Sequence, residues 1–406
     1  MNMPLKGYRV VDWTQWQAGP GASMMLGDFG AEVIKIEDRI TGDPARGVLH
    51  VFDEWKVRGN GEENVQEAYF ECSNRNKKGM ALDLHKEQGR AIIHRLVKKS
   101  DVFITNFRES AASNYGLDYR TLSQLNPKLI YASVSGYGSN GPDADIRSYD
   151  VLGMARAGLL FASDTEEPHY PVGGLADAET GIMTAFGVAM ALLTRERQGI
   201  GQKVEASLLS RMLFQQWVAL GFKFIGNEMW LPIPRDRAAN PLGNSYKCSD
   251  GKWIFLCHPQ ADRFWPNVCK ALGIEEKQND PKFENMLKRR QNNAELIGIM
   301  DKVFATKTCE AWVKILQENE CICERVNHLD DLLTDPQVLA NDYLPEFDHP
   351  AYGKVRYAPM PFKLSKTPGS VRLPAPEFGQ HTEEIMTEVL GYSWDEVSRL
   401  KEAQVI

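Results

Sequence analysis

The sequence lacks the short motifs that usually mark a metal site or a disulfide framework. Its seven cysteines include no C-x-x-C pair, and its eight histidines include no H-E-x-x-H motif. The number of cysteines is odd and their spacing is scattered, so neither a zinc site nor a set of disulfides is predicted. Cys321 and Cys323 are interpreted as part of a strand or turn rather than as metal ligands. We therefore expect a metal-independent chemistry.

The sequence also lacks a secretion signal, a membrane-spanning run and a basic stripe. Residues 1–6 show no basic segment followed by an apolar one. The longest weakly polar stretch, 182–193, is much shorter than the roughly 20 residues that a membrane helix needs. The net charge is −7, and Lys and Arg are concentrated only in the run 75–78. We expect a cytoplasmic protein with neither a nucleic-acid nor a membrane partner.

The composition is that of a soluble globular protein of more than one domain. Of the 406 residues, 43% are hydrophobic and 25% are charged. This length suggests two or three domains. We predict a large domain built from 1–200 and 371–406, and a small α+β domain at 226–325. Irregular passages at 201–225 and 326–370 are predicted to link the two parts.

Strands and helices alternate along the first half of the chain. The alternation predicts an open, mostly parallel sheet covered by helices on both faces, which is a Rossmann-like α/β fold. The predicted strands are 8–13, 33–36, 102–105 and 128–134, and the predicted helices are 86–98 and 179–197. In the small part, an Asp250-Gly251 turn between two β-prone runs predicts a hairpin. The helices predicted there are 263–272, 294–305 and 309–318.

Glycine-bearing stretches after predicted strands offer the first candidate sites. Ala18-Gly19-Pro20-Gly21 is predicted to form a turn before a helix, and it partly matches a dinucleotide-binding G-x-G-x-x-G. Met24 replaces the third glycine, so a general phosphate site at a helix N-terminus is the alternative to NAD binding. The loop that begins at Ser135-Gly136-Tyr137-Gly138 follows a strand, where such sheets bind ligands, although an ordinary surface loop has the same pattern.

Two further features carry charge. Asp177 precedes the long apolar helix, so it is either an N-cap that accepts backbone N–H groups or a carboxylate nucleophile held at a helix N-terminus. The basic run Arg75-Asn76-Lys77-Lys78 is either a phosphate contact or a solvated loop. The residues alone leave both pairs of alternatives open.

Many short motifs, taken in order, resemble the class III coenzyme A transferases of the CaiB/BaiF type, which include formyl-CoA transferase. The resemblance covers essentially the whole chain. It rests on Gln17-Ala18-Gly19-Pro20, 30–37, Asn74-Arg75-Asn76-Lys77-Lys78-Gly79, Asn106-Phe107-Arg108, Ser135-Gly136-Tyr137-Gly138, Tyr149-Asp150, Gly174-Leu175-Ala176-Asp177 and 199–204. It implies a Rossmann-like large domain with a small inserted domain, and two interlocked chains forming a homodimer. It also implies acyl-CoA and a free carboxylic acid as substrates, with no permanently bound cofactor.

The same resemblance assigns roles to residues. The aspartate that matches Asp177 is the nucleophile, which passes CoA onward through an aspartyl anhydride and an aspartyl-CoA thioester. Gln17 lies beside the thioester and is a candidate donor to the oxyanion. The implied CoA contacts are Gln17, Ala18, Asn74, Arg75, Lys77, Lys78, Asn106, Phe107, Arg108, Ser135, Gly136, Tyr137 and Gly138. Asp38 and Asn114 replace basic residues that are common in the family, so the phosphates are expected to meet Arg75, Lys77, Lys78 or Arg108.

Two other functions remain as alternatives. A 2-methylacyl-CoA racemase needs a histidine before the aspartate, where this chain has Tyr149-Asp150. A non-catalytic subunit of a heteromeric transferase is the second alternative, against which the presence of Asp177 argues. The sequence leaves the acids open: Trp16, Tyr137, Tyr149 and the aromatic passage 217–230 either line an acyl pocket or belong to the core. A mid-sized aromatic, hydroxy or dicarboxylic acid is expected.

Overall fold

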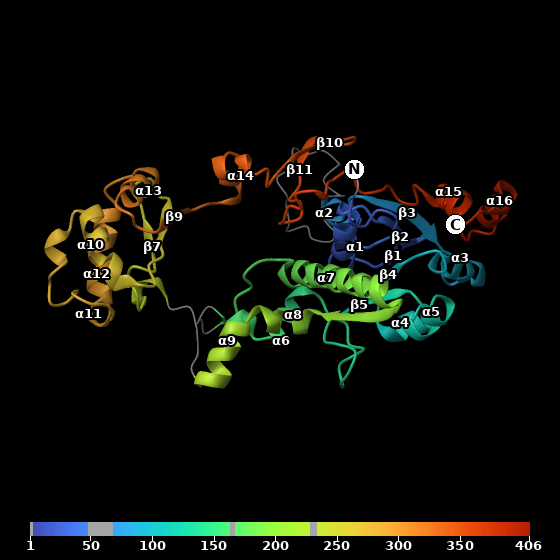
Figure 1. The fold of residues 1–406 in the computed structure, drawn as a ribbon, viewed down its shortest axis with the longest axis horizontal. Coiled ribbons are helices and arrows are strands. Elements are labelled where there is room, and N and C mark those ends of the chain that lie inside the picture. Colours follow the sequence, from blue (N-terminus) through green and yellow to red (C-terminus); the bar gives the residue numbers. More distant parts are fainter. Residues whose placement is uncertain (1–2, 48–67, 163–166, 228–233) are drawn as a thin grey trace. The chain divides into compact units, whose positions relative to one another are not determined.

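The chain divides into two units in a computed structural model that describes residues 3–47, 68–162, 167–227 and 234–406 (Figure 1). The first unit comprises Met1–Leu160, Tyr170–Asn227 and Tyr343–Ile406, and the second comprises Phe161–His169 and Glu228–Asp342. The domain boundaries predicted from the sequence stay a prediction. Strand β6 and helix α8, defined below, lie within the predicted linker 201–225.

Six parallel strands form the sheet of the first unit, in the order β3-β2-β1-β4-β5-β6. They are β1 (Arg9–Trp13), β2 (Glu32–Asp38), β3 (Lys77–Leu82), β4 (Val102–Thr105), β5 (Ile130–Ser135) and β6 (Gln202–Ser207). The predicted parallel α/β sheet is confirmed, although β3 and β6 were not predicted. The strand order reverses between β1 and β4, and at such a reversal the following loops diverge and leave a crevice for a ligand.

One face of the sheet lies under two helices. Val10 and Val33 share a buried cluster with residues of α1 (Ala18–Asp28) and α7 (Leu175–Gln198). Figure 1 shows α7 lying alongside α1, and the two helices are in extensive contact. This packing brings the N-terminal ends of both helices to the same region of the unit.

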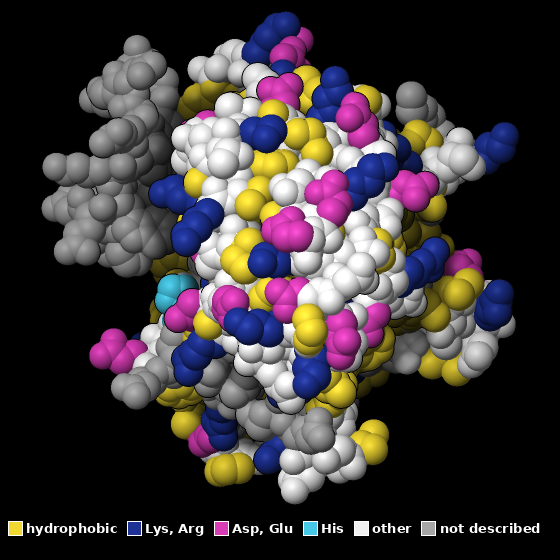
Figure 2. Space-filling model, turned by 90° about the vertical axis from the view of Figure 1, so that its left-hand side faces the viewer, with side chains coloured by type: hydrophobic (Ala, Val, Ile, Leu, Met, Phe, Trp, Pro, Cys, Tyr) yellow, Lys and Arg dark blue, Asp and Glu magenta, His cyan; other side chains and the backbone are white. Residues whose placement is uncertain are grey.

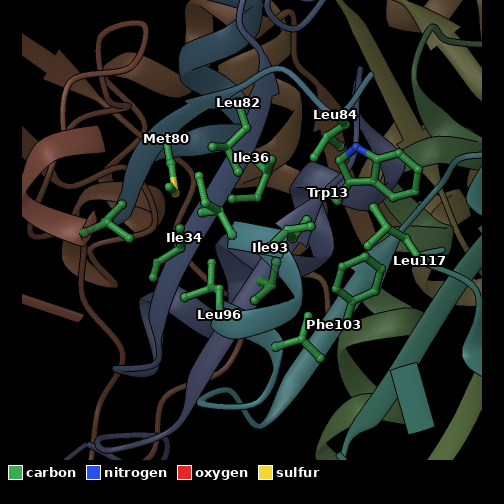
Figure 3. Close-up of a cluster of buried hydrophobic side chains, with 14 of the residues drawn as sticks. Trp13, Ile34, Ile36, Met80, Leu82, Leu84, Ile93, Leu96, Phe103 and Leu117 are labelled. Atoms are coloured by element: carbon green, nitrogen blue, oxygen red, sulfur yellow. The ribbon is translucent and has the colours of Figure 1, made fainter. Parts of the chain in front are cut away.

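The next residue of each strand points to the opposite face, because side chains alternate along a strand. Val11 and Ile34 enter a second cluster with α3 (Glu87–Val97) and with the C-terminal segment around Ile385. Figure 3 shows this cluster, in which side chains of the sheet lie around Ile93 and Leu96 of α3. The C-terminal segment thus helps to cover the second face of the sheet.

Helix α7 is longer than the predicted 179–197. It has 24 residues, and among the described residues it is the one helix long and apolar enough to cross a membrane. Of its most apolar window, 44% is buried, and the helix packs on α1, β5 and β6. This packing is that of a core helix. It is not buried all round, however, since Phe186 and Met190 are exposed.

The predicted turn at Ala18-Gly19-Pro20-Gly21 is wrong, because these residues are the first turn of α1. Gly19 allows the helix to start close to the preceding chain: a Cβ there would lie 2.6 Å from Cγ2 of Thr14. Proline is tolerated in a first turn, where its missing N–H has no intrahelical acceptor. The actual turn lies earlier, at Trp16 and Gln17.

The second unit combines a three-stranded antiparallel sheet with helices. The sheet contains β7 (Ser245–Lys247), β8 (Trp253–Leu256) and β9 (Cys323–Val326). The helices are α10 (Ala261–Leu272), α11 (Met286–Gln291), α12 (Asn293–Phe304), α13 (Cys309–Glu318) and α14 (Pro336–Ala340). The predicted hairpin and the three predicted helices are confirmed. Cys323 lies in a strand, as interpreted from the sequence.

The remaining elements belong to the first unit. They are α2 (Ala68–Asn74), α4 (Glu109–Asn114), α5 (Tyr119–Leu125), α6 (Asp150–Arg156), α8 (Leu208–Gln215), α9 (Trp217–Gly221), β10 (Glu346–His349), β11 (Gly353–Arg356), α15 (Thr382–Glu384) and α16 (Trp394–Glu402). Ser393 and Glu396 form the predicted capping box of α16. The face drawn in Figure 2 carries Lys and Arg interspersed with Asp and Glu, with no large area of one sign.

Candidate functional site

The carboxylate of Asp150, the first residue of α6, organises the start of α7. Its Oδ2 accepts hydrogen bonds from the Gly174 backbone N–H (3.0 Å) and the Tyr170 hydroxyl (2.8 Å), and its Oδ1 accepts one from the Asp177 N–H (2.9 Å). The N-cap of α7 is Gly174, with a left-handed φ of 77°. The interpretation of Asp177 as the N-cap is therefore wrong: Asp150 supplies the capping carboxylate from another helix.

Asp177 itself lies in the first turn of α7, partly buried and beside a cavity. No hydrogen bond to its carboxylate oxygens occurs within the part of the chain that the structure describes. Burial, followed by the neighbouring Asp150 carboxylate, raises the pKa of Asp177 to about 7. The result is a carboxylate with free lone pairs that titrates near neutral pH, which is a suitable state for a nucleophile.

Gln17 connects the start of α1 to the start of α7. As the N-cap residue of α1, it donates from Nε2 to the Gly174 carbonyl (3.3 Å) and accepts at Oε1 from the Tyr69 hydroxyl (3.2 Å). A Cβ on Gly174 would lie 2.8 Å from the Gln17 side-chain amide. Glycine is thus required at residue 174 both for its φ and for the close approach of Gln17.

Asn106 joins the loops after β1 and β4 at the point where the strand order reverses. Its Oδ1 accepts from the Gln15 N–H (2.9 Å), and its Nδ2 donates to the Gln15 carbonyl (2.7 Å). The next residue, Phe107, stacks on Trp13 with ring centroids 4.1 Å apart. Both amide atoms of Asn106 are therefore engaged in holding the two loops together.

A cavity of about 360 Å³ opens at this end of the sheet, next to Asp177. It brings together most of the residues that the sequence predicted as a site. Those lining it are Ala18, Asn106, Phe107, Arg108, Ser135, Gly136, Gly138 and Asp177. Tyr137 is not among them; the Arg156 guanidinium lies over its ring, 4.6 Å from the centroid. A smaller cavity of about 190 Å³ shares Gln15 and Phe107 with the first.

Three cationic side chains line the larger cavity. Arg108 lies 3.6 Å from a carboxylate oxygen of Asp145, and Lys203 lies 2.9 Å from one of Glu205. Arg147 has no ion pair within the described residues. Sequence reasoning did not single out Arg147 or Lys203, although Lys203 falls in one of the quoted motifs, 199–204.

The basic run 75–78 is not a solvated loop. Arg75 and Asn76 form the turn between α2 and β3, and Lys77 and Lys78 begin β3. Arg75 and Lys77 are buried. Arg75 pairs with Asp28 (2.7 Å), and Lys77 with Asp12 (2.8 Å). Burial, opposed by the Asp12 charge, lowers the pKa of Lys77 to about 8. These charges are already neutralised inside the unit, so they offer nothing to a phosphate.

The flanking residues of the run are also committed within the unit. Asn74, fully buried, accepts from Lys77 Nζ (2.7 Å), and Lys78 pairs with Glu384 (2.7 Å) and Glu32 (3.1 Å). The structure therefore does not bring 74–78 to the cavity lining. Sequence reasoning missed the roles of Tyr69, Tyr170 and Asp150. For Asp150, the quoted Tyr149-Asp150 motif was the available signal.

The described residues contain no group of three or more His, Cys, Asp or Glu side chains that could hold a metal ion. The arrangement is instead a carboxylate that accepts no hydrogen bond from the described residues and that lines a cavity with three cations on its wall. The Gln17 amide reaches the same helix start, at the Gly174 carbonyl. Such a set can add a carboxylate to a carbonyl and stabilise the resulting oxyanion.

Comparison with known proteins identifies the family of the chain. Residues 5–382 match a family model described as CoA-transferase family III. The chain is 31% identical over 409 residues to (R)-2-hydroxy-4-methylpentanoate CoA-transferase of Clostridioides difficile, covering 100% of both chains. It is 32% identical to mouse (Mus musculus) succinyl-CoA:glutarate CoA-transferase, covering 98% of this chain and 89% of that one.

Solved structures show the same architecture. The structure of a CaiB/BaiF family protein from Brucella suis superposes with a TM-score of 0.82 at 27% sequence identity. The match covers 96% of this chain and 100% of that one.

Proposed function

The chain belongs to CoA-transferase family III, and from this premise we propose that Asp177 carries the transferred group between two half-reactions. The observation that supports this assignment is the carboxylate of Asp177: partly buried, without a hydrogen bond in the described chain, and with a pKa raised to about 7. Its position in the first turn of α7 places the anion near a helix N-terminus, whose dipole partly offsets the destabilisation by burial and by Asp150.

In the first half-reaction, the Asp177 carboxylate attacks the carbonyl carbon of the donor acyl-CoA. The C–S bond breaks, giving a mixed anhydride and the CoA thiolate. The thiolate then attacks the aspartyl carbonyl of the anhydride. This step forms an aspartyl-CoA thioester and releases the first acid as a carboxylate.

The second half-reaction runs the same steps in reverse with a different acid. The acceptor carboxylate attacks the aspartyl thioester, which forms a new anhydride and again frees the thiolate. The thiolate attacks the acceptor carbonyl, so the new acyl-CoA leaves and the Asp177 carboxylate is restored. The acyl bond energy is kept throughout, provided that water is excluded from the anhydride and the thioester.

Each step passes through a tetrahedral oxyanion that needs a hydrogen-bond donor. Gln17 is the proposed side-chain donor, because its Nε2 already lies 3.3 Å from the Gly174 carbonyl at the start of α7. That distance is long for an amide hydrogen bond, so little is lost when the N–H turns to an oxyanion. Tyr69, which donates to Oε1 of Gln17, fixes the amide orientation.

The proposed CoA site follows the larger cavity. Ala18 lies beside the thioester, while Phe107 and Arg108 line the path of the CoA chain together with Ser135, Gly136 and Gly138. We assign the phosphates to Arg108, Arg147 and Lys203, with no permanently bound cofactor. Arg75 and Lys77 leave the proposal, because their buried carboxylate partners already neutralise them.

The proposed substrates are an acyl-CoA donor and a mid-sized organic acid, exchanged in the cytoplasm. Relatives whose names specify a branched hydroxy acid and a dicarboxylic acid both cover nearly all of this chain.

A homodimer is also proposed. Exposed apolar side chains on α7, on α9 and just after it support a partner surface there; they include Phe186, Trp217, Phe224 and Ile225.

Trapping of the intermediate tests the mechanism. The purified chain alone is incubated with a panel of acyl-CoA donors and then with hydroxylamine, which converts an aspartyl anhydride or thioester to a hydroxamate. Mass spectrometry is expected to find the hydroxamate at residue 177 and to find none in Asp177→Ala. Transfer of CoA without any modification of residue 177 would refute the mechanism. Trapping that requires a second, different chain would show that this one is a subunit of a heteromer.

A further inference from the structure

Trp16 has a backbone conformation that a bulky residue rarely adopts. Its φ is 66°, in the left-handed region that glycine enters freely and large side chains avoid. The turn after β1 would form at lower cost with glycine at this position. A tryptophan kept there despite the strain indicates that the indole ring has a use of its own.

A buried ion pair holds Trp16 in this conformation. The Trp16 N–H donates to Oδ1 of Asp43 (3.1 Å), and Oδ2 of Asp43 lies 2.8 Å from Nζ of Lys35. Lys35 also donates to the Thr14 carbonyl (3.1 Å). Both charged side chains are fully buried, so the turn is fixed from two sides by groups that water does not reach.

The held ring faces a second aromatic ring at the cavity. The rings of Trp16 and Tyr149 lie perpendicular, with centroids 5.9 Å apart, and both residues line the cavity that Asp177 lines. Tyr149 is 57% exposed and nearby Ile146 is 51% exposed, so the described residues of the unit leave this apolar wall uncovered. Such a wall in a concave site favours an apolar ligand.

The residues that follow Trp16 and Tyr149 in the sequence connect this apolar wall to the start of α7, where Asp177 lies. Trp16 precedes Gln17, whose amide reaches Gly174 at the start of α7. Tyr149 precedes Asp150, whose carboxylate accepts the backbone N–H of Asp177. The wall is therefore tied to the end of the cavity where the acyl group reacts.

We propose that Trp16, set against Tyr149, determines acyl specificity: the wall selects acids with an apolar body of about phenyl or isobutyl size over small dicarboxylates. This proposal rests on the proposed function, since it concerns the acyl group that Asp177 carries. The cations of the cavity do not contradict it. Arg108, Arg147 and Lys203 are all assigned to the CoA phosphates, so none of them is reserved for a second carboxylate of the acid.

The test compares acceptor acids with one common acyl-CoA donor. The wild-type chain is expected to use 3-phenylpropionate and 4-methylpentanoate with kcat/KM at least about 10-fold above that for succinate. Trp16→Asn removes the ring while keeping a residue that tolerates positive φ. It is expected to lower kcat/KM for the two apolar acids by about 10-fold or more and to leave that for succinate within about 3-fold. Trp16→Phe is expected to retain most of the preference.

Equal losses for all three acids would overturn the proposal, because the ring would then serve CoA binding or the fold. A wild-type preference for succinate would also overturn it. Trp394→Asn, which removes an exposed indole from α16, is the matched control. It is expected to leave the kcat/KM of each apolar acid relative to that of succinate unchanged.

Calorimetric binding of the free acids separates this proposal from the proposed function. If no CoA is transferred but 3-phenylpropionate binds and Trp16→Asn weakens it selectively, the specificity wall stands and the transferase mechanism falls. If CoA is transferred and neither acid binding nor turnover depends on Trp16, the transferase mechanism stands and the specificity wall falls.

Discussion

Replacing Asp177 with Asn is expected to stabilise the folded chain at alkaline pH while abolishing transfer. In the folded chain the pKa of this carboxyl rises from 3.8 to about 7. The folded state therefore holds the Asp177 proton more tightly than the unfolded state does. Above about pH 4, the unfolded chain gains by ionising first, so the wild-type chain loses stability as the pH rises.

The size of the effect follows from the shift. A rise from 3.8 to about 7 is roughly three pKa units, and each unit corresponds to about 1.4 kcal/mol. The loss of wild-type unfolding free energy that Asp177 causes is thus absent below about pH 4. It grows between about pH 4 and pH 7 and reaches about 4 kcal/mol above pH 7. Asn has nearly the shape of Asp, and no hydrogen bond to the carboxylate occurs in the described chain, so the substitution removes the penalty with little other cost.

Urea denaturation of wild type and Asp177→Asn at pH 4, 6 and 8.5 measures the gain. The variant is expected to be more stable by a few kcal/mol at pH 8.5 and nearly equal at pH 4. Asp348→Asn, at an exposed residue of β10, serves as the control and is expected to show no pH-dependent gain. A gain that is the same at all three pH values, or a loss at pH 8.5, would refute the assigned charge environment.

Three further substitutions test the surroundings. Transfer needs the Asp177 anion, so the midpoint of the wild-type pH–rate profile is expected near pH 7. Asp150→Asn removes the charge that helps raise the pKa of Asp177 and is expected to move this midpoint to lower pH. An unmoved midpoint would show that the charge of Asp150 does not act on the nucleophile. Arg75→Ala removes the cation that pairs with the buried Asp28 carboxylate, to which the Asn76 amide still donates, and is expected to cost about 3 kcal/mol of unfolding free energy in urea. A selective rise in the KM for acyl-CoA at unchanged stability would instead return Arg75 to the phosphate site. Gly181→Ala places a Cβ 2.9 Å from a backbone oxygen of α1, so thermal stability and transfer are both expected to fall, and a variant that melts with the wild type would show that the two helices can separate at no cost.

The basic run 75–78 shows where sequence reasoning failed. Four polar or charged residues in succession suggest a solvated loop, because lysine and arginine are rarely buried. Arg75 and Lys77 are buried all the same, because Asp28 and Asp12 approach them from parts of the chain far away in sequence. Nothing local to the run indicates that such partners exist.

Asp177 illustrates the opposite case. The motif around it predicted a carboxylate at the start of a long apolar helix, and α7 begins there. The sequence did not show that Asp150, 27 residues earlier, supplies the cap and frees the Asp177 side chain. A cap can come from any carboxylate that the fold brings near, so its origin cannot be read from spacing.

The sequence by itself determined the family, the parallel α/β sheet and the candidate nucleophile, because β-branched runs, helical periodicity and short ordered motifs are local properties of the chain. Only the tertiary structure decided which groups meet. The reversal of strand order between β1 and β4 opens the crevice, and the packing of α1 on α7 brings Gln17 to Gly174. Charge pairing and burial depend on distances between remote segments, and these are fixed only when the sheet and its two helical layers assemble.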